Sequence, residues 1–402
     1  MSAPVANCSR LWDVIVIGGG PAGATAAQEI AGAGHSVLLL ERHSRIKPCG
    51  GAVPQRLIED FAIPDHLLVA KVCEARMVAP SGRIVDMPIE SGFVGMVDRE
   101  HFDEWLRQRA GSHGCARLRA EFRTITPVEA CGQDPFHYRL DCTGQGGLGV
   151  GALRALTVIG ADGAHSSVAR QRIAHSGRGR YVAAYHEIVR SPPERDGGRC
   201  EVHYDGRLSP DFYGWVFPHG DTTSVGVGSA RRGFSLRRAT QRLRQAARLE
   251  GAVTLRREGA PIPLRPLKRW DDGRGVILAG DAAGVVAPAS GEGIYYAMLS
   301  GQLAARALLE FLRDGKPAAL RAARRAFLRA HGRVFWILGV MQWFWYGSDS
   351  RRERFVSICR DPDVQRLTWQ AYLHKRLTRE PASTHARIFF KDLAHLFGWA
   401  RV

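Results

Sequence analysis

The 402-residue sequence lacks several features that would place it in a simple class. No run approaches the roughly 20 apolar residues that span a bilayer, and residues 1–12 contain neither the basic region nor the apolar region of a secretory signal. The 8 cysteines form no Cys-x-x-Cys pair and no Cys/His group with zinc-ligand spacing. These absences favour a cytoplasmic protein with reduced thiols and no bound metal.

Lysine is scarce as well, so arginine carries almost all of the positive charge behind a formal net charge of +17. A basic excess is typical of proteins that bind nucleic acid, anionic membranes or phosphorylated ligands. Here, however, the arginines are scattered along the whole chain rather than gathered in one block. Because nucleic-acid binding needs a clustered basic face, we expect no nucleic-acid partner.

Residues 13–41 predict a dinucleotide-binding unit. The apolar run 14–17 leads into GGGPAG, an Ala-rich helix follows, and a second apolar run at 37–40 ends in Glu41. This order of strand, glycines, helix, strand and acid is typical of sites that hold a diphosphate on a helix N-terminus. Glu41 would accept from the adenosine ribose hydroxyls, and its charge disfavours the 2′-phosphate of NADP at this site.

Each glycine of this motif has a different task. Gly18 permits the tight turn, Gly20 lets the backbone approach a diphosphate, and Gly23 lets the helix pack closely against the strand. The motif alone leaves FAD and NAD open.

Two later segments place an acid beside glycine after an apolar run. They read VIGADGA at 158–164, with Asp162 and Gly163, and GVILAGDAAG at 275–284, with Asp281. An acid at the carboxyl end of a strand can bond hydroxyl groups near a diphosphate. The same pattern is also typical of an ordinary turn with an N-capping aspartate.

The stretch KPCGGAVP at 47–54 sets a cysteine between a proline and two glycines. Cys49 could be a redox partner, an acid, a metal ligand or a small filler. No further ligands and no nearby second cysteine accompany it, which disfavours a metal site and a disulfide relay. The two glycines would shape a tight turn.

Residues 181–268 alternate apolar and polar side chains, which predicts an antiparallel sheet. Within it, alternation places Tyr213, Trp215 and Phe217 on one face of a strand. Spacing alone favours a stripe that faces the core over an aromatic wall of a ligand pocket.

Taken together, the segments resemble the glutathione-reductase-type flavoproteins, and in particular their p-hydroxybenzoate-hydroxylase-like branch. The pattern P-x-x-Y-x-W-x-F-P at 210–218, KPCGGAVP, SGEGIYYA at 290–297 and the region 341–369 resemble geranylgeranyl reductases. Nearly the whole chain is covered by this resemblance.

The resemblance implies an α/β (α+β) fold with three parts. We expect a discontinuous FAD-binding Rossmann-like domain at 10–80, 97–178 and 270–330. An inserted antiparallel-sheet substrate domain is expected at 81–96 and 179–269, and a C-terminal helical region at 331–402.

The implied site residues follow from the matching motifs. The expected FAD-binding residues are Gly18, Gly20, Ala22, Gly23, Glu41, Arg42, Cys49, Gly50, Gly51, Arg99, Asp162, Gly163, Asp281, Gly291, Gly293 and Ile294. Arg99 enters through the helix at 97–110, whose arginine contacts the cofactor in that branch. The expected substrate pocket is Tyr213, Trp215, Phe217 and Pro218, and Cys49 is the candidate catalytic residue.

The implied reaction is reduction of isolated C=C bonds in a geranylgeranyl chain, free as the diphosphate or attached to chlorophyll or bacteriochlorophyll, to give phytyl. NADPH would reduce FAD, which would then deliver hydride to the alkene. An aromatic monooxygenase or halogenase of the same fold, and a non-catalytic prenyl or pigment carrier, are the alternatives.

A substrate this apolar enters from a membrane, so we expect peripheral contact with a photosynthetic membrane. The segment 334–346, rich in Trp and Phe and followed by arginines, predicts either an interfacial docking element or a helix packed on the protein.

Overall fold

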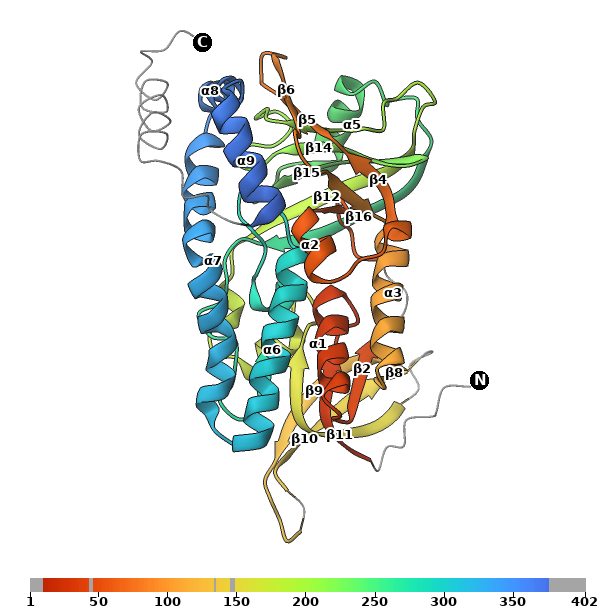
Figure 1. The fold of residues 1–402 in the computed structure, drawn as a ribbon, viewed down its shortest axis with the longest axis vertical. Coiled ribbons are helices and arrows are strands. Elements are labelled where there is room, and N and C mark those ends of the chain that lie inside the picture. The colour runs from red at the N-terminus through yellow and green to blue at the C-terminus, as the bar shows by residue number, and fades with distance from the viewer. Residues whose placement is uncertain (1–9, 43–45, 134, 145–148, 376–402) are drawn as a thin grey trace. The chain divides into compact units, whose positions relative to one another are not determined.

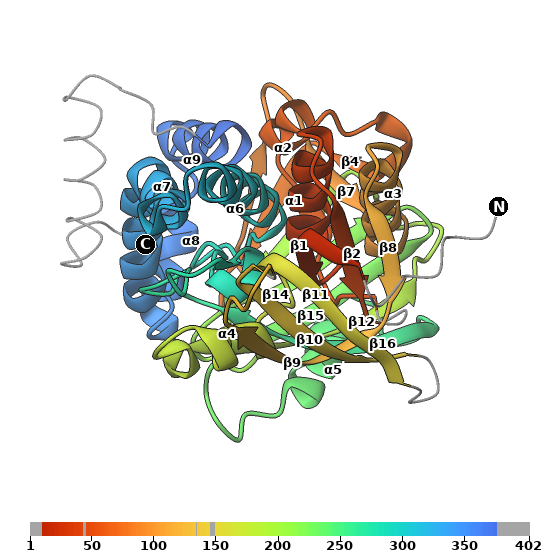
Figure 2. The ribbon, with the colours of Figure 1, turned by 90° about the horizontal axis from the view of Figure 1, so that it is seen from below.

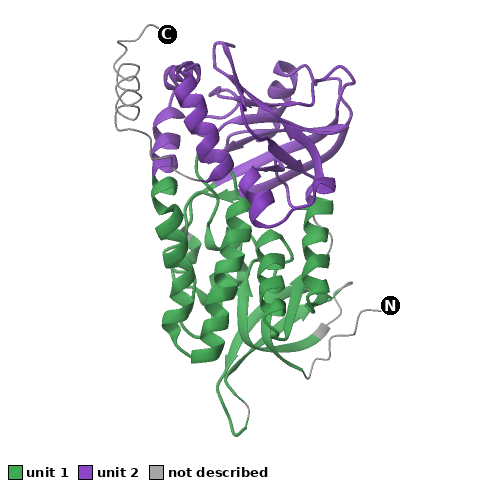
Figure 3. Cartoon of the chain, viewed as in Figure 1, with its two compact units in different colours: residues 1–46, 100–181, 262–336 green, residues 47–99, 182–261, 337–402 purple. Residues whose placement is uncertain are grey.

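The computed structural model describes residues 10–42, 46–133, 135–144 and 149–375 (Figure 1). The chain divides into two compact units (Figure 3). Unit 1 contains residues 1–46, 100–181 and 262–336, and unit 2 contains residues 47–99, 182–261 and 337–402. Each unit is described by itself below.

This division differs from the expected domain boundaries mainly at two places. Residues 47–80 belong to unit 2 rather than to the dinucleotide-binding unit, because β3 (Ala52–Val53) and β4 (Leu68–Val72) both pair with β7 (Val94–Val97). Residues from 337 onward also belong to unit 2 rather than to a separate region. The last part of the expected helical region, 376–402, lies outside the described residues.

Unit 1 contains a seven-stranded sheet in the order β8-β2-β1-β11-β10-β9, with β17 paired to β11. Its strands β8, β2, β1, β11 and β17 are parallel neighbours, whereas β9, β10 and β11 form an antiparallel meander. The bounds are β1 Leu11–Ile17, β2 Val37–Glu41, β8 Ala116–Arg119, β9 Glu121–Val128, β10 His137–Thr143, β11 Gly149–Gly160 and β17 Val276–Leu278. The apolar runs predicted at 14–17 and 37–40 therefore form neighbouring strands, and β11 lies between β1 and the strand at 276–278.

Unit 1 also contains helices. They are α1 (Pro21–Gly32), α3 (Arg99–Ser112), α4 (Ser167–Arg172), α6 (Ile294–Asp314) and α7 (Pro317–Trp345), of which α7 continues past residue 336 into unit 2. Figures 1 and 2 both show α1 and α6 side by side. A side chain at Gly301 of α6 would collide with the carbonyl oxygen of Ala22 in α1, so glycine permits this close approach.

Unit 2 contains a second seven-stranded sheet in the order β16-β12-β15-β14-β13-β5-β6. The bounds are β5 Glu74–Val78, β6 Ile84–Pro88, β12 Tyr181–Arg190, β13 Arg199–His203, β14 Gly214–His219, β15 Thr222–Ser229 and β16 Thr254–Pro263. Its helices are α2 (Gln55–Asp60), α5 (Leu236–Ala246), α8 (Asp349–Ile358) and α9 (Pro362–His374). The antiparallel pairs β12–β15, β15–β14 and β14–β13 agree with the predicted alternation.

The two faces of this second sheet differ in character. One face buries Val216 and Val225 against Leu243 of α5. On this side Arg244 Nη1 of α5 donates to Glu187 Oε2 of β12 at 2.7 Å and fastens the helix to the sheet. Because side chains alternate along a strand, Trp215 and its neighbours two residues away point to the other face.

None of the described helices is both long and apolar enough to cross a membrane.

Candidate functional site

The glycine motif after β1 has the geometry that its sequence predicts. Gly18 has φ of +108°, and a side chain there would strike the backbone of Ala161, far inside the 3.0 Å that real Cβ atoms keep. A side chain at Gly23 would strike the carbonyl oxygen of Gly18 in the same way. Both glycines are therefore required by the packing of the protein itself.

Gly20 is different, because the space beside it is open. Apart from its chain neighbours, no heavy atom among the described residues lies within 4 Å of the place where its Cβ would be. Gly20 is also the N-cap of α1, and no side chain caps that helix, whose first helical residue is Pro21. An uncapped helix N-terminus beside free space is suited to a diphosphate, so the residues present fit the expected dinucleotide.

Glu41 lies at the end of β2 with its side chain 12% exposed. Its two carboxylate oxygens are 2.9 Å from Arg107 Nε and 3.0 Å from Arg117 Nη2. Glu104 bonds both arginines as well, which lowers the pKa of Glu104 although burial opposes that shift. The network fixes the carboxylate of Glu41 at the point where the sequence predicts recognition of ribose hydroxyls. The sequence gives no sign that these two arginines would meet Glu41.

The two later acid–glycine segments are brought to the first motif by strand pairing. β11 lies between β1 and β17, with Ile159 paired to both Val16 and Ile277. The turns that follow these three parallel strands therefore share one edge of the sheet. Asp162 and Asp281 stand in two of those turns, as predicted.

Asp162 also serves the local fold. Its carboxylate accepts from the Ser166 hydroxyl at 2.5 Å and from the Ser167 backbone N–H at 2.6 Å, at the start of α4. Burial raises its pKa, and these hydrogen bonds act against that rise. This is the capping role that the sequence left open, and the contact of Asp162 and Gly163 with a cofactor stays a prediction.

The loop before α6 is shaped by left-handed backbone. Gly280 and Gly284 flank Asp281 with φ of +64° and +80°, and Gly291 has φ of +66°. α6 begins at Ile294 with Gly293 as its N-cap, and again no side chain caps the helix. Unit 1 thus presents two helix N-termini without a side-chain cap, those of α1 and α6, and the contact of Gly291, Gly293 and Ile294 with a cofactor stays a prediction.

Two further expected cofactor residues are placed less distinctly. Arg42 follows β2 with its side chain 60% exposed and lies 3.7 Å from Glu121. Arg99 is the first residue of α3 and is buried. Their contact with a cofactor stays a prediction.

In unit 2 the KPCGGAVP loop lies along the face of β14 that carries the aromatic side chains. A Cβ on Gly50 would stand 3.0 Å from Phe217 Cδ2 and 3.9 Å from Trp215 Nε1. A Cβ on Gly51, where φ is +74°, would stand 2.6 Å from the carbonyl oxygen of Val97 and closer still to His219 Nε2. The structure therefore brings together two motifs that lie some 160 residues apart in the sequence.

The strand continues the alternation one step beyond the predicted residues. His219 follows Phe217 on the same face, and its Nδ1 lies 3.2 Å from the Phe217 carbonyl oxygen. Burial lowers the pKa of His219, which favours its neutral imidazole. The two-residue spacing predicts that His219 lies on this face, but the family pattern ends at residue 218 and so does not include it.

Cys49 and Tyr213 are the remaining predicted residues of this loop and strand. The Gly51 backbone N–H donates to Cys49 Sγ at 3.4 Å, which holds the sulfur in the turn. Tyr213 is buried, and burial, with smaller effects from Tyr346 and Cys49, raises the pKa of its hydroxyl. Pro218 points to the opposite face from Phe217, so it shapes the strand rather than the aromatic face.

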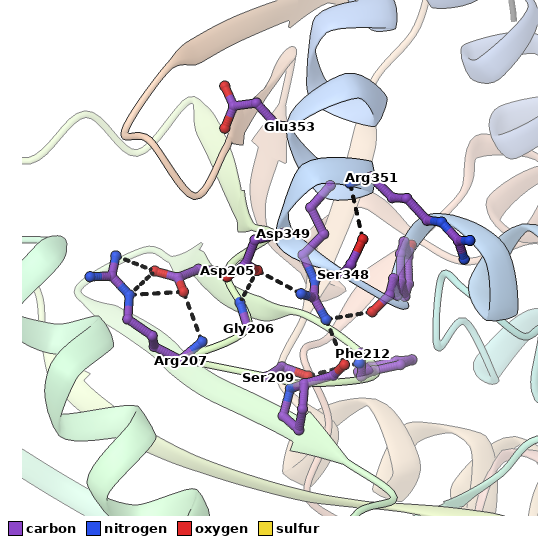
Figure 4. Close-up of polar contacts among 12 residues, drawn as sticks. Asp205, Gly206, Arg207, Ser209, Phe212, Ser348, Asp349, Arg351 and Glu353 are labelled. Atoms are coloured by element: carbon purple, nitrogen blue, oxygen red, sulfur yellow. Dashed lines mark hydrogen bonds and ion pairs between the residues drawn. The ribbon is translucent and has the colours of Figure 1, made fainter. Parts of the chain in front are cut away.

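The segment that leads into Tyr213 is anchored by α8. The buried guanidinium of Arg352 donates to the carbonyl oxygen of Pro210 at 2.5 Å, to that of Tyr346, and to Asp349 Oδ1 at 2.6 Å. Asp349 in turn accepts from the Gly206 backbone N–H at 2.8 Å (Figure 4). The sequence pattern does not predict this role of Arg352, because α8 and the segment at Pro210 are far apart in sequence.

Among the described residues, no group of three or more His, Cys, Asp or Glu side chains could hold a metal ion.

Comparison with known proteins decides the family. Residues 13–68 match the family described as FAD dependent oxidoreductase, and residues 85–332 match the family described as FAD binding domain. Geranylgeranyl diphosphate reductase of Rhodobacter capsulatus is 53% identical over 392 residues, which cover 96% of this chain and 98% of that protein. The chain belongs to the geranylgeranyl reductase family.

A more distant relative agrees with this assignment, and a solved structure shows the same fold. Geranylgeranyl diphosphate reductase of Synechocystis is 33% identical over 399 residues, 95% of this chain and 97% of that protein. The solved structure of a geranylgeranyl bacteriochlorophyll reductase-like protein from Thermoplasma acidophilum has a TM-score of 0.79 at 22% identity, covering 93% of this chain and 99% of that one. The predicted family, fold class and flavin-dependent oxidoreductase class are confirmed.

Proposed function

We propose that this protein uses FAD and NADPH to reduce isolated C=C bonds of a geranylgeranyl chain. The observation that carries the proposal is the packing of Gly50 and Gly51 against Trp215, Phe217 and His219 on β14, since both motifs belong to the reductase pattern. The relatives named as geranylgeranyl diphosphate reductases support the substrate class.

An isolated alkene carries no carbonyl group that an enzyme could polarise. The flavin, when bound, supplies the hydride. The protein must hold the apolar chain, exclude water and deliver a proton to the second carbon. Residues of unit 1 suited to hold the cofactor are Gly20, at its open helix N-terminus, and Glu41.

The aromatic face of β14 is suited to the apolar chain. Tyr213, Trp215 and Phe217 would offer flat apolar surfaces to an alkene without a polar anchor, so the chain could shift along them between reductions. Cys49 is the group that we assign to the proton. Its sulfur already accepts from the Gly51 N–H, so its own S–H remains available to donate.

NADPH as the donor rests on the family resemblance. The one glycine motif that the sequence shows carries Glu41, which disfavours the 2′-phosphate of NADP there. The nicotinamide would therefore reduce the flavin without a Rossmann site of its own.

The test is anaerobic. Purified protein with bound flavin is reduced with NADPH and then mixed with geranylgeranyl diphosphate or with geranylgeranylated bacteriochlorophyll, while the flavin spectrum and the prenyl products are followed. Reoxidation coupled to loss of C=C bonds is expected, and the better of the two substrates identifies the carrier. Reoxidation only by oxygen, with a hydroxylated product, would establish a monooxygenase, and binding without turnover would establish a carrier.

We also propose peripheral contact with a photosynthetic membrane, supported by one face of α7. Trp336, Val340 and Trp343 are 70%, 43% and 75% exposed. Their spacing of four and three residues places them in one stripe, which the exposed Arg329 and Arg333 continue toward the N-terminus. Aromatic side chains next to arginine are suited to the interface of an anionic bilayer.

Flotation with vesicles of phosphatidylcholine, with and without phosphatidylglycerol, tests this surface. The full chain should float with the anionic vesicles, and a Trp336→Ser, Trp343→Ser variant should not. Leu255→Ser, at another exposed apolar residue, is the matched control and should float like the wild type. Equal flotation of all three proteins would refute the assignment of this stripe.

A further inference from the structure

A line of hydrogen bonds crosses four neighbouring strands of the sheet in unit 2. Glu258 of β16, His186 of β12, Ser224 of β15 and Trp215 of β14 each supply one side chain, in the order in which these strands lie in the sheet. Glu258 Oε2 lies 3.1 Å from His186 Nε2, His186 Nδ1 lies 2.9 Å from Ser224 Oγ, and Trp215 Nε1 lies 3.1 Å from Ser224 Oγ.

The chemistry of these groups gives the line a single direction. An indole N–H can only donate, so Ser224 Oγ accepts from Trp215. A carboxylate can only accept, so His186 Nε2 donates to Glu258; in the neutral imidazole with this tautomer, Nδ1 accepts from the Ser224 hydroxyl. Every member is satisfied in this arrangement, which is the condition under which a buried polar network stabilises one conformation.

A catalytic triad is the obvious alternative, since acid, histidine and serine lie in that order. Burial argues against it, because Ser224 is 0% and His186 is 3% exposed. The serine oxygen is also already occupied on both sides, by the indole and by the imidazole. The line therefore ends at Trp215 rather than at a nucleophile.

Glycine makes room for this arrangement. Gly226 of β15 is paired with His186 on one side and with Trp215 on the other. A Cβ at Gly226 would stand 2.5 Å from His186 Cβ and still closer to the Trp215 ring. Glycine at this position lets the indole pack closely against β15, within hydrogen-bond distance of Ser224.

The indole also borders the KPCGGAVP loop. The position of a Cβ on Gly50 is 3.9 Å from Trp215 Nε1, the same atom that donates to Ser224. The rotation of the ring about its Cα–Cβ and Cβ–Cγ bonds is thus fixed by Ser224, and the ring in turn borders the loop that carries Cys49.

We propose that Glu258, His186 and Ser224 form a positioning chain that sets the orientation of Trp215 against the Cys49 loop, and so the alignment of the prenyl chain. This inference rests on the proposed function for its catalytic consequence. None of the three residues is assigned contact with substrate, and each acts through the indole.

The test combines a spectroscopic readout with kinetics. Ultraviolet resonance Raman spectra, taken as the difference between the wild type and Trp215→Phe, report the hydrogen bond of the Trp215 indole N–H. In Ser224→Ala this bond should weaken, and kcat/KM for prenyl reduction should fall about tenfold, as expected for a misaligned reactive group. Ser224→Thr keeps the hydroxyl and should recover most of the loss.

A double-mutant comparison separates positioning from simple stability. In a Trp215→Phe background, Ser224→Ala should cause little further loss, because the chain no longer has a ring to orient. Thr223→Val is the matched control, since Thr223 is buried next to Ser224 on the opposite face and bonds Ser191. It removes one buried hydroxyl yet should leave the Trp215 spectrum unchanged.

Two results would overturn the proposal. One is a Trp215 spectrum in Ser224→Ala identical to that of the wild type. The other is a kinetic loss that adds in full to that of Trp215→Phe. If the wild-type protein reduces no prenyl substrate, the proposed function fails, whereas the spectrum still decides whether the chain orients the ring.

Discussion

Gly51 offers a sharp test of the loop that carries Cys49, because its surroundings can be compared with those of another glycine. In Gly51→Ala the new Cβ would stand 2.6 Å from the carbonyl oxygen of Val97, and His219 Nε2 would be closer. Gly82, also in unit 2, has a similar φ of +84°, but outside its chain neighbours no heavy atom of the described residues lies within 4 Å of its Cβ position. The two variants share the backbone strain and differ in the crowding.

The expected magnitudes follow from those two terms. A left-handed backbone costs a non-glycine residue about 1–2 kcal/mol, and overpacking adds about 1–3 kcal/mol. Gly82→Ala should therefore lower the free energy of unfolding by about 1–2 kcal/mol, and Gly51→Ala by about 2–5 kcal/mol. Chemical denaturation of the purified variants measures both values.

Gly51→Ala should also affect the position of the Cys49 thiol and the activity. Gly51 donates its N–H to Cys49 Sγ and accepts from the Val97 N–H at 2.9 Å, so a shifted Gly51 moves the thiol. Prenyl reduction should fall in Gly51→Ala and persist in Gly82→Ala. Removal of the imidazole in a Gly51→Ala, His219→Ala double variant should recover part of the lost stability. Equal stability and equal activity of Gly51→Ala and Gly82→Ala would refute the packing described for this loop.

Four further outcomes are expected. Gly20→Ala should leave the unfolding of the flavin-free protein nearly unchanged but abolish flavin binding, as measured by flavin content, because its methyl group fills only the diphosphate space. Cys49→Ala and Cys49→Ser should slow single-turnover alkene reduction, and unchanged rates in both would relegate the thiol to packing. Arg352→Met should cost about 2–4 kcal/mol in urea denaturation, since it leaves buried carbonyl oxygens without their donor. Burial opposes ionisation of Glu187, but the hydrogen bonds that it accepts from Arg244 and Tyr185 lower its pKa below the ordinary 4.5. The stability that Glu187 adds is therefore complete above pH 4.5 and is lost as the pH falls through the lowered pKa; this loss should be absent in Glu187→Gln.

The parts of the structure that the sequence predicts are those with local signals. Continuous apolar runs next to glycine predict the strands that end at Ile17 and Leu278, and the Ala-rich stretch after the first glycines predicts helix α1. The shared face of Trp215 and Phe217 followed from their two-residue spacing, and the neighbouring loop confirms that both rings point the same way. Each of these features is decided within about ten residues of chain.

What the sequence does not predict depends on contacts between distant residues. No sequence pattern near Glu41 predicts its ion pairs with Arg107 of α3 and Arg117 of β8. The line from Glu258 to Trp215 needs four strands in one order, and no pattern within a strand encodes that order. The placement of residues 47–80 was missed for the same reason, since β3 and β4 are held by β7 rather than by their sequence neighbours.

The division of the chain also has a consequence for synthesis on the ribosome. Unit 1 is assembled from three separate stretches, the last of which ends at residue 336. The glycine motif is synthesised first. Ala22, however, can pack against Gly301 of α6 only after α6 has been synthesised, and β11 can pair with β17 only after β17 has been synthesised. Most of the polypeptide must therefore emerge before the nucleotide-binding sheet can close, and flavin capture is a late event in the life of the nascent chain.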